Sequence, residues 1–254
     1  KLRKLHWWLD LGTREKYEAH MLANPDYRKP FALAFFSNEK LIKVFPTEEA
    51  AENFENRFWM LEDSDMLPRA ITRRGRCISY DIIWSPSVYN AKSFDTQDFA
   101  KMLRVFRDTL WEPIWDSTID YSEFYRLKTE NRAKMFLQSD ELPEEIRNID
   151  WSIFKDGVRA RIHGDLQFDN ILFDKTDFYL IDWRPSFGGQ AEEYGDLYYD
   201  LAKLLSGIRL NIELAKEDRE FKPINNHELF EKVLEEFHER NDLDFKRTKI
   251  LCAT

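Results

Sequence analysis

Two acidic side chains and one amide side chain occur close together in one segment of the sequence, and their types suit a single chemistry. Asp165 and Asn170 belong to the loop 163–170, and Asp182 follows a predicted hairpin over residues 171–181. A carboxylate can accept the proton of an attacking alcohol, while hard oxygen ligands can hold Mg²⁺ against the phosphates of a nucleotide. The loop and hairpin are expected to bring the three side chains together, and the segment therefore predicts phosphoryl transfer.

The elements that must position these side chains form two groups with different hydrophobic patterns. Apolar runs at residues 31–36 and 41–45 surround a polar turn and predict a hairpin, a helix follows Thr47 to about Leu61, and a strand is expected over 76–84. The rest of the chain has mainly helical spacing. Helices are expected over residues 95–110, 121–137, from about 143, 194–210 and 227–240. We therefore expect a small sheet, then a larger helical part, with the acidic loop at their junction.

The composition excludes several classes of protein. The chain has 254 residues, enough for one or two domains, and its 47 acidic and 38 basic residues give a formal net charge of −9. This balance argues against general nucleic-acid binding, which depends on massed Lys and Arg, but it allows one small cationic pocket. Cys77 and Cys252 are too few for a disulfide framework, and the five histidines show no metal-ligand spacing. The longest apolar run is far too short to span a bilayer, so we expect a cytoplasmic protein.

The residues around Asp165 resemble those of a known family. His163-Gly164-Asp165, followed by Asn170 and by Ile-Asp-Trp at 181–183, is similar to the catalytic segments of the aminoglycoside phosphotransferase/choline kinase family. The resemblance implies an α+β, bilobal protein-kinase-like fold, with a small antiparallel sheet lobe before a larger, mainly helical lobe. It also implies an ATP-dependent kinase of small-molecule hydroxyls that uses Mg²⁺. Asp165 would be the catalytic base, and Asn170 and Asp182 the metal ligands.

The small sheet contains residues that match the nucleotide site of this family. Leu41-Ile42-Lys43-Val44 resembles the strand whose lysine binds the α and β phosphates of ATP. The resemblance implies Glu55 in the following helix as the ion-pair partner of Lys43, with Glu52 as an open alternative. Ile82 and Ile83 lie where the hinge between the lobes would contact adenine.

Two further residues are expected to support the catalytic loop. His163 is expected to hold the loop by hydrogen bonds and to take no part in proton transfer. Residues 194–202 resemble the helix in which an aspartate braces this loop, and Asp196 matches that position. The alternative is that Asp196 and Asp200, one helical turn apart, both face solvent.

One part of the family pattern is missing from the sequence. Kinases cover the phosphates with a glycine-rich loop, but Gly12 is the only glycine before Gly75. Arg28 and Lys29, at the equivalent position, could supply charge in its place. The resemblance divides the chain into a linker or tail (1–25), a small N-terminal lobe (26–86) and a helical C-terminal lobe (87–254).

The first stretch carries a second resemblance. Residues 8–17 are similar to the closing segment of sugar-phosphate nucleotidyltransferases, and the chain does not begin with methionine. This implies the kinase half of a longer bifunctional protein, with a nucleotidyltransferase domain in the same chain. Such a protein would make activated precursors for surface polysaccharide.

The acceptor of the phosphoryl group stays open at this stage. Asp169, with Glu192 and Glu193, could attract a cationic substrate, whereas Arg184 could bind an acidic one. Aminoglycosides, choline, ethanolamine, sugars and glycerate all remain candidates for the acceptor. The sequence determines neither whether the phosphate donor is ATP or GTP nor the oligomeric state. The alternative function is a catalytically weak, nucleotide-binding pseudokinase that regulates or scaffolds a nucleotidyltransferase. The missing glycine loop favours this alternative, and the joint presence of the lysine, the two aspartates and the asparagine opposes it.

Overall fold

The computed structural model describes residues 33–37, 39–62, 66–114, 118–185, 187, 194–211 and 222–253. The expectations for residues 1–32, with Arg28 and Lys29 among them, lie outside these residues, as do those for Glu192 and Glu193.

Within the described residues, the N-terminal part is built on a four-stranded antiparallel sheet. Its strands are β1 (Leu33–Ser37), β2 (Lys40–Val44), β3 (Thr72–Arg74) and β4 (Cys77–Asp81), in the order β1-β2-β4-β3. The predicted hairpin is β1–β2, and the strand expected over 76–84 is the shorter β4. Its partner β3 was not predicted, because three residues of sequence Thr-Arg-Arg carry no apolar alternation.

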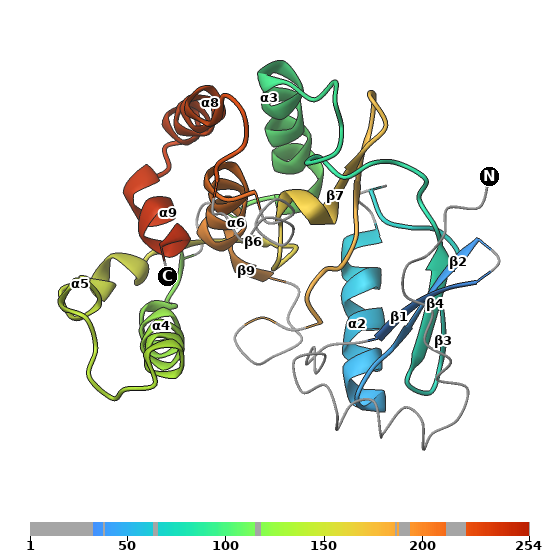
Figure 1. Ribbon diagram of the computed structural model, residues 1–254, viewed down its shortest axis with the longest axis horizontal. Helices are drawn as coiled ribbons and strands as arrows, with labels where there is room; N and C mark the ends of the chain where they lie inside the picture. The colour runs from blue at the N-terminus through green and yellow to red at the C-terminus, as the bar shows by residue number, and fades with distance from the viewer. Residues whose placement is uncertain are drawn as a thin grey trace.

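Helix α2 (Glu48–Leu61) packs against this sheet. Thr47 caps it by accepting a hydrogen bond from the Ala50 amide at 3.1 Å, as its sequence predicts. The buried face of α2 repeats at helical spacing and consists of Ala51, Phe54, Arg57, Phe58 and Leu61. Figure 1 shows α2 between the sheet and the larger part of the molecule, so this one helix can contact both.

The larger part is mainly helical, with short strands near its centre (Figure 1). Its first elements are α3 (Thr96–Val105), the π-helix η3 (Phe106–Trp111), β5 (Thr118–Ile119), α4 (Ser122–Leu137), α5 (Glu144–Arg147) and the 3-10 turn η4 (Trp151–Phe154). They are followed by β6 (Gly157–Arg161), the 3-10 turn η5 (Phe168–Asn170), β7 (Ile171–Phe173) and β8 (Phe178–Leu180). The last elements are β9 (Tyr194–Asp196), α6 (Leu197–Arg209), α8 (His227–Arg240) and α9 (Phe245–Cys252).

Most of the predicted helices are present, with one shifted start and one omission. The helix expected over 194–210 begins only at Leu197, because residues 194–196 form β9 and pair with β6. Asp196 consequently becomes the N-cap of α6. Helix α9 was not predicted.

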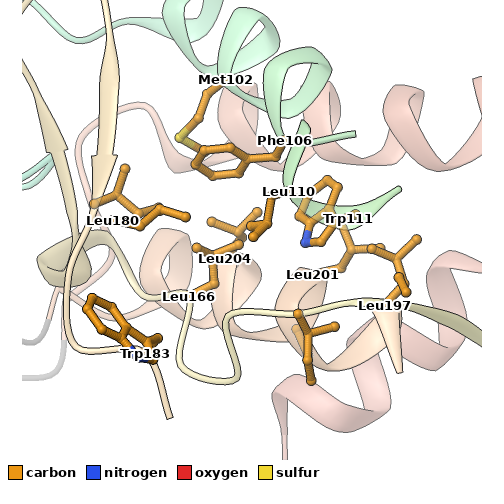
Figure 2. Close-up of a cluster of buried hydrophobic side chains, with 14 of the residues drawn as sticks. Met102, Phe106, Leu110, Trp111, Leu166, Leu180, Trp183, Leu197, Leu201 and Leu204 are labelled. Carbon is orange, nitrogen blue, oxygen red and sulfur yellow. The ribbon is translucent and has the colours of Figure 1, made fainter. Parts of the chain in front are cut away.

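A hydrophobic core lies directly beneath the loop 163–170. Figure 2 shows Met102 and Phe106 at one end of the cluster and Leu166 of the loop at the other, with Leu110 and with Leu204 and Leu201 of α6 in the same cluster. All of these side chains are almost fully buried. Burial of each contributes about 1.5–3 kcal/mol to stability, so the loop is anchored through Leu166 to a rigid support.

The hairpin β7–β8 is tied to α2 by the residue that follows Asp182. Trp183 stacks on Phe54 with ring centroids 4.3 Å apart and donates a hydrogen bond from Nε1 to the Phe54 carbonyl at 3.0 Å. The small sheet and the helical part therefore meet at this tryptophan. Within the described residues, no helix combines the length and the apolar character needed to cross a membrane.

Candidate active site

The loop that carries Asp165 begins just after β6 and turns sharply at Gly164. Gly164 has a φ of +83°, and a Cβ at this position would lie 3.0 Å from the Cβ of Arg184. The turn thus requires glycine for its left-handed backbone and for the close approach of Arg184.

Asp200 of α6 holds this turn in place. Its carboxylate accepts hydrogen bonds from the His163 amide at 2.7 Å and the Gly164 amide at 2.9 Å, and from Trp111 Nε1 at 3.1 Å. Asp200 is fully buried, and burial raises its pKa to about 6. Three donors on one buried carboxylate make this aspartate the brace of the loop.

The prediction that Asp196 braces the loop is therefore wrong. Asp196 is equally buried, but it caps α6 through the Tyr198 amide at 3.2 Å and accepts a hydrogen bond from the Tyr125 hydroxyl at 2.9 Å. Because α6 begins at Leu197, the carboxylate of Asp196 is used at the helix terminus. The aspartate one turn later is the one that reaches the loop, and neither of the two faces solvent.

His163 links the loop to the hairpin. Its Nδ1 accepts a hydrogen bond from the Asp165 amide at 3.3 Å, so Nε2 carries the proton and donates to the Ile181 carbonyl at 2.9 Å. Burial lowers the pKa of His163 to about 4, which keeps the ring neutral. A neutral ring with both nitrogens in hydrogen bonds positions Asp165, and its one N–H proton is held by the Ile181 carbonyl.

Asn170 lies beside Asp165 at the start of the hairpin. Its side-chain Nδ2 donates to the backbone carbonyl of Asp165 at 2.8 Å, and its backbone carbonyl accepts from the Ile181 amide at 3.0 Å. The hairpin thus returns to the loop, and the remaining polar atom of the Asn170 side chain is an oxygen.

Asp182 follows at once and contacts the small sheet. Its carboxylate forms an ion pair with Nζ of Lys43, whose buried side chain lies over the Phe54 ring, 4.8 Å from the centroid. The backbone of Asp182 has a φ of +60°, a left-handed conformation rare for residues other than glycine. Local strain of this kind is concentrated at functional sites.

Asp165 is held between two cations. Its carboxylate lies 2.7 Å from Arg184 Nη2 and 3.0 Å from Lys203 Nζ. Burial acts to raise the pKa of Asp165, but Lys203 and Arg184 outweigh it and the pKa lies below its ordinary value. The group is therefore an ionised carboxylate at neutral pH.

Other predicted residues lie elsewhere. The expected ion pair between Lys43 and Glu55 is not formed, because Glu55 pairs with Arg73 Nε of β3 at 2.6 Å. Successive residues of a helix point about 100° apart, so Phe54 lies under Lys43 while Glu55 turns towards β3. The alternative partner, Glu52, is exposed.

The predicted hinge and substrate residues can also be placed. The Ile82 amide donates to the Glu39 carbonyl at 2.9 Å, and Ile83 is half-buried in the segment after β4. Asp169 lies in η5, next to Asn170.

Arg57 of α2 is a structural link that the sequence analysis missed. It is almost fully buried, and its Nη2 donates to the carbonyl of Ile162, the residue before His163. Its place in the apolar stripe of α2, three residues after Phe54, could have marked it as inward-facing. Together with Trp183, this arginine ties α2 to the catalytic loop.

Comparison with known proteins now identifies the family of this segment. The model of the phosphotransferase enzyme family matches residues 97–221, which include the loop, the hairpin and α6. Residues 97–221 belong to the phosphotransferase family. The resemblance stated from the sequence is confirmed, and so is the enzyme class, a phosphotransferase. No curated protein in the comparison matches the chain.

Solved structures with similar folds agree with the architecture predicted for this chain. The gentamicin complex of APH(2")-IIa has a TM-score of 0.54 at 14% identity, covering 96% of this chain and 85% of that chain. A glucosamine kinase with glucosamine, ADP and inorganic phosphate has a TM-score of 0.53 at 11% identity, covering 92% and 77%. APH(3'')-Id from Streptomyces rimosus has a TM-score of 0.51 at 18% identity, covering 96% and 97%. The α+β, bilobal protein-kinase-like fold is confirmed, whereas the resemblance of residues 8–17 to nucleotidyltransferases has no support in these comparisons.

Proposed function

We propose that this phosphotransferase transfers the γ-phosphate of ATP to a hydroxyl of a small molecule. The observation that carries the proposal is the convergence of Asp165, Asn170, Asp182 and Lys43, which hydrogen bonds and one ion pair join where the sheet meets the helical part. Phosphoryl transfer depends mainly on positioning and on charge neutralisation, and these four side chains provide both.

Each side chain has a stated task in this proposal. Asp165, kept ionised by its two cations, orients the acceptor hydroxyl and takes its proton. Lys43 contacts the α and β phosphates, and its burial against Phe54 fixes the direction of the ammonium group. Asp200 and His163 act through Asp165, because they hold the backbone amides of residues 163–165.

The side-chain oxygens of Asn170 and Asp182 are suitable ligands for Mg²⁺. An amide oxygen and a carboxylate are hard ligands, and Mg²⁺ is usually bound by one or two protein groups together with substrate phosphates and water. Among the described residues, no group of three or more His, Cys, Asp or Glu side chains is arranged to hold a metal ion, so the protein would supply only part of the ligand set. When bound, the ion would neutralise charge on the phosphates.

The acceptor class and the wider role are further parts of the proposal. Two structural neighbours are named with glucosamine and with gentamicin, both small hydroxyl-bearing molecules, which supports the same class of acceptor here. We also propose a cytoplasmic location, and a longer chain that includes a nucleotidyltransferase and supplies surface-polysaccharide precursors. Reading the coding sequence upstream of Lys1 tests the last of these.

The boundary between the two lobes, proposed near residue 86, is supported by backbone pairing. The Phe173 amide donates to the Pro86 carbonyl at 3.0 Å, and the Val88 amide donates to the Ile171 carbonyl at 2.9 Å. Residues 86–88 thus already belong to the strand pairing of β7. Ile82 and Ile83 precede this point, as a hinge would.

The test is incubation of the protein with MgATP and a panel of sugars, amino alcohols and hydroxy acids, followed by ³¹P NMR. The proposal predicts a new phosphomonoester signal that forms together with ADP. ATP binding without transfer to any acceptor would favour the pseudokinase alternative. Absence of both binding and transfer would contradict the proposal.

A further inference from the structure

A pocket lined by cationic side chains lies next to Asp165 in the helical part. It has a volume of about 230 Å³ and is formed mainly by residues of α4, α6 and α9. Lys128 and Arg132 of α4 and Lys203 of α6 line it, and none of its described lining residues is an aspartate or glutamate. This is unusual in a chain whose net charge is −9, and the positive charge is therefore local to the pocket.

Lys203 connects the pocket to the proposed catalytic base. Its Nζ lies 3.0 Å from Oδ1 of Asp165, while Arg184 approaches the other carboxylate oxygen at 2.7 Å. A small molecule whose hydroxyl reaches Asp165 would therefore place its remaining atoms against these cations. Lys203 and Arg184 already neutralise the single charge of Asp165, so the charge of Lys128 exceeds what the carboxylate requires.

Lys128 is held in the pocket without a carboxylate partner in the described part of the chain. Its Nζ donates to the Tyr199 hydroxyl at 2.6 Å and lies 4.1 Å from the centroid of the same ring. Burying an ammonium group costs free energy unless it is paired, and a hydroxyl and a ring face offset only part of this cost. Burial, followed by repulsion from Arg132, Lys203 and Arg184, lowers the pKa of Lys128 to about 7, with Asp165 acting in the opposite direction.

We propose that this pocket binds an anionic group, a phosphate or a carboxylate, carried by the acceptor whose hydroxyl reaches Asp165. The inference rests on the proposed function and adds the charge class of the acceptor. It favours an acidic substrate, as expected if Arg184 binds the acceptor. It argues against the cationic substrate that Asp169 was expected to attract. Choline and aminoglycosides would meet repulsion from Lys128, Arg132 and Lys203. The volume suits a small molecule, since pockets for drug-sized ligands begin at about 300 Å³.

The test measures equilibrium binding by calorimetry, with a non-hydrolysable ATP analogue present, for matched sets of probes. One set is glycerol, glycerate and glycerol 3-phosphate, and another is glucose, gluconate and glucose 6-phosphate. Choline and ethanolamine serve as cationic probes. We expect the anionic members to bind more tightly than their neutral counterparts, and the comparison of acid with phosphate shows which anion the pocket prefers.

Matched variants assign the effect to the pocket. Lys128→Met should weaken binding of the anionic probes about tenfold or more, as expected for loss of one charge-assisted contact. Lys128→Arg keeps the charge and should retain the preference for anions. Lys134→Met, on the same helix but outside the pocket, should leave binding unchanged.

Three results would overturn the inference. They are tighter binding of neutral or cationic probes, no binding of any anionic probe to the folded protein, and equal losses in Lys128→Met and Lys134→Met. If Lys128→Met does not fold, the unmodified protein and Lys128→Arg still decide the charge preference. Failure of the proposed function is distinguishable, because it appears as absence of phosphoryl transfer to an acceptor that does bind.

Discussion

Lys43 of β2 and Asp182, which are 139 positions apart in the chain, form an ion pair where the small sheet meets the helical part. The lysine side chain is buried against Phe54, whereas the carboxylate is half exposed. Trp183 fixes the neighbouring backbone to α2 through the Phe54 carbonyl. The pair therefore connects the two parts of the molecule at the position proposed for the nucleotide phosphates.

Replacement of Lys43 by methionine tests this position. Methionine fills similar space and the remaining Asp182 carboxylate is half exposed to water, so the melting temperature should change little. In contrast, kcat/KM for ATP should fall about 10²–10³-fold because one preorganised cation is lost. Steady-state kinetics and calorimetry measure the two effects. Lys40→Met is the matched control, since Lys40 lies on the same strand and pairs with the half-exposed Asp81 at 2.5 Å. Unchanged kinetics in Lys43→Met would contradict the assignment.

The two buried aspartates of the β9–α6 junction should separate stability from catalysis. Asp200→Asn and Asp196→Asn each place an amide where a carboxylate accepts several hydrogen bonds. Each should lower the free energy of unfolding by about 1–3 kcal/mol. Only Asp200→Asn should also lower kcat strongly at temperatures where both variants are folded, because Asp200 holds the catalytic loop. Equal losses of kcat would mean that Asp200 has no special part in positioning Asp165.

His238 should make stability depend on pH at the contact between α8 and α9. Its ring joins α8 to α9 through Thr248 Oγ1 at 2.8 Å, and burial lowers its pKa to about 4. The neutral ring is favoured in the fold, so its contribution is complete above the unfolded pKa of about 6.5. It is lost as pH falls from there towards 4, by up to about 1.4 kcal/mol per pH unit. Denaturant titrations at a series of pH values give the free energy of unfolding as a function of pH. Between about pH 6.5 and 4 this free energy should fall less steeply for His238→Gln than for the unmodified protein. An equal pH dependence in the two proteins would contradict the prediction.

Acceptor binding should also depend on pH, through Lys128. Its pKa of about 7 in the free protein would rise when an anion binds, so binding takes up a proton. The Kd of a carboxylate probe should therefore increase as pH rises above about 7, by up to about tenfold per unit. Lys128→Arg, which stays protonated, should remove this increase. A Kd that falls with rising pH would contradict the account.

Much of the local structure was predictable because its signals lie close together in the sequence. The β1–β2 hairpin, the Thr47 cap of α2 and the extent of α4 follow from short-range patterns. The loop and hairpin around Asp165 were equally readable, since their residues are near neighbours. The structure brings Asp165 and Asn170 together as that pattern implied.

The features that the sequence predicted wrongly or did not predict depend on contacts between distant segments. The choice between Asp196 and Asp200 follows from where α6 begins, and that is set by the pairing of β9 with β6. Whether Glu55 faces Lys43 or Arg73 depends on how α2 lies on the sheet. The composition allowed one small cationic pocket, but only the packing of α4 against α6 brings Lys128 and Lys203 to the same place.

The central claim is that Asp165 orients the acceptor hydroxyl and accepts its proton, and one measurement tests it most directly. Asp165→Asn is compared with the unmodified protein and with the surface control Asp156→Asn, using calorimetric ATP binding and single-turnover phosphoryl transfer. The account predicts nearly unchanged ATP binding with a transfer rate lowered about 10²–10⁴-fold in Asp165→Asn alone. Transfer at the unmodified rate in Asp165→Asn would contradict it.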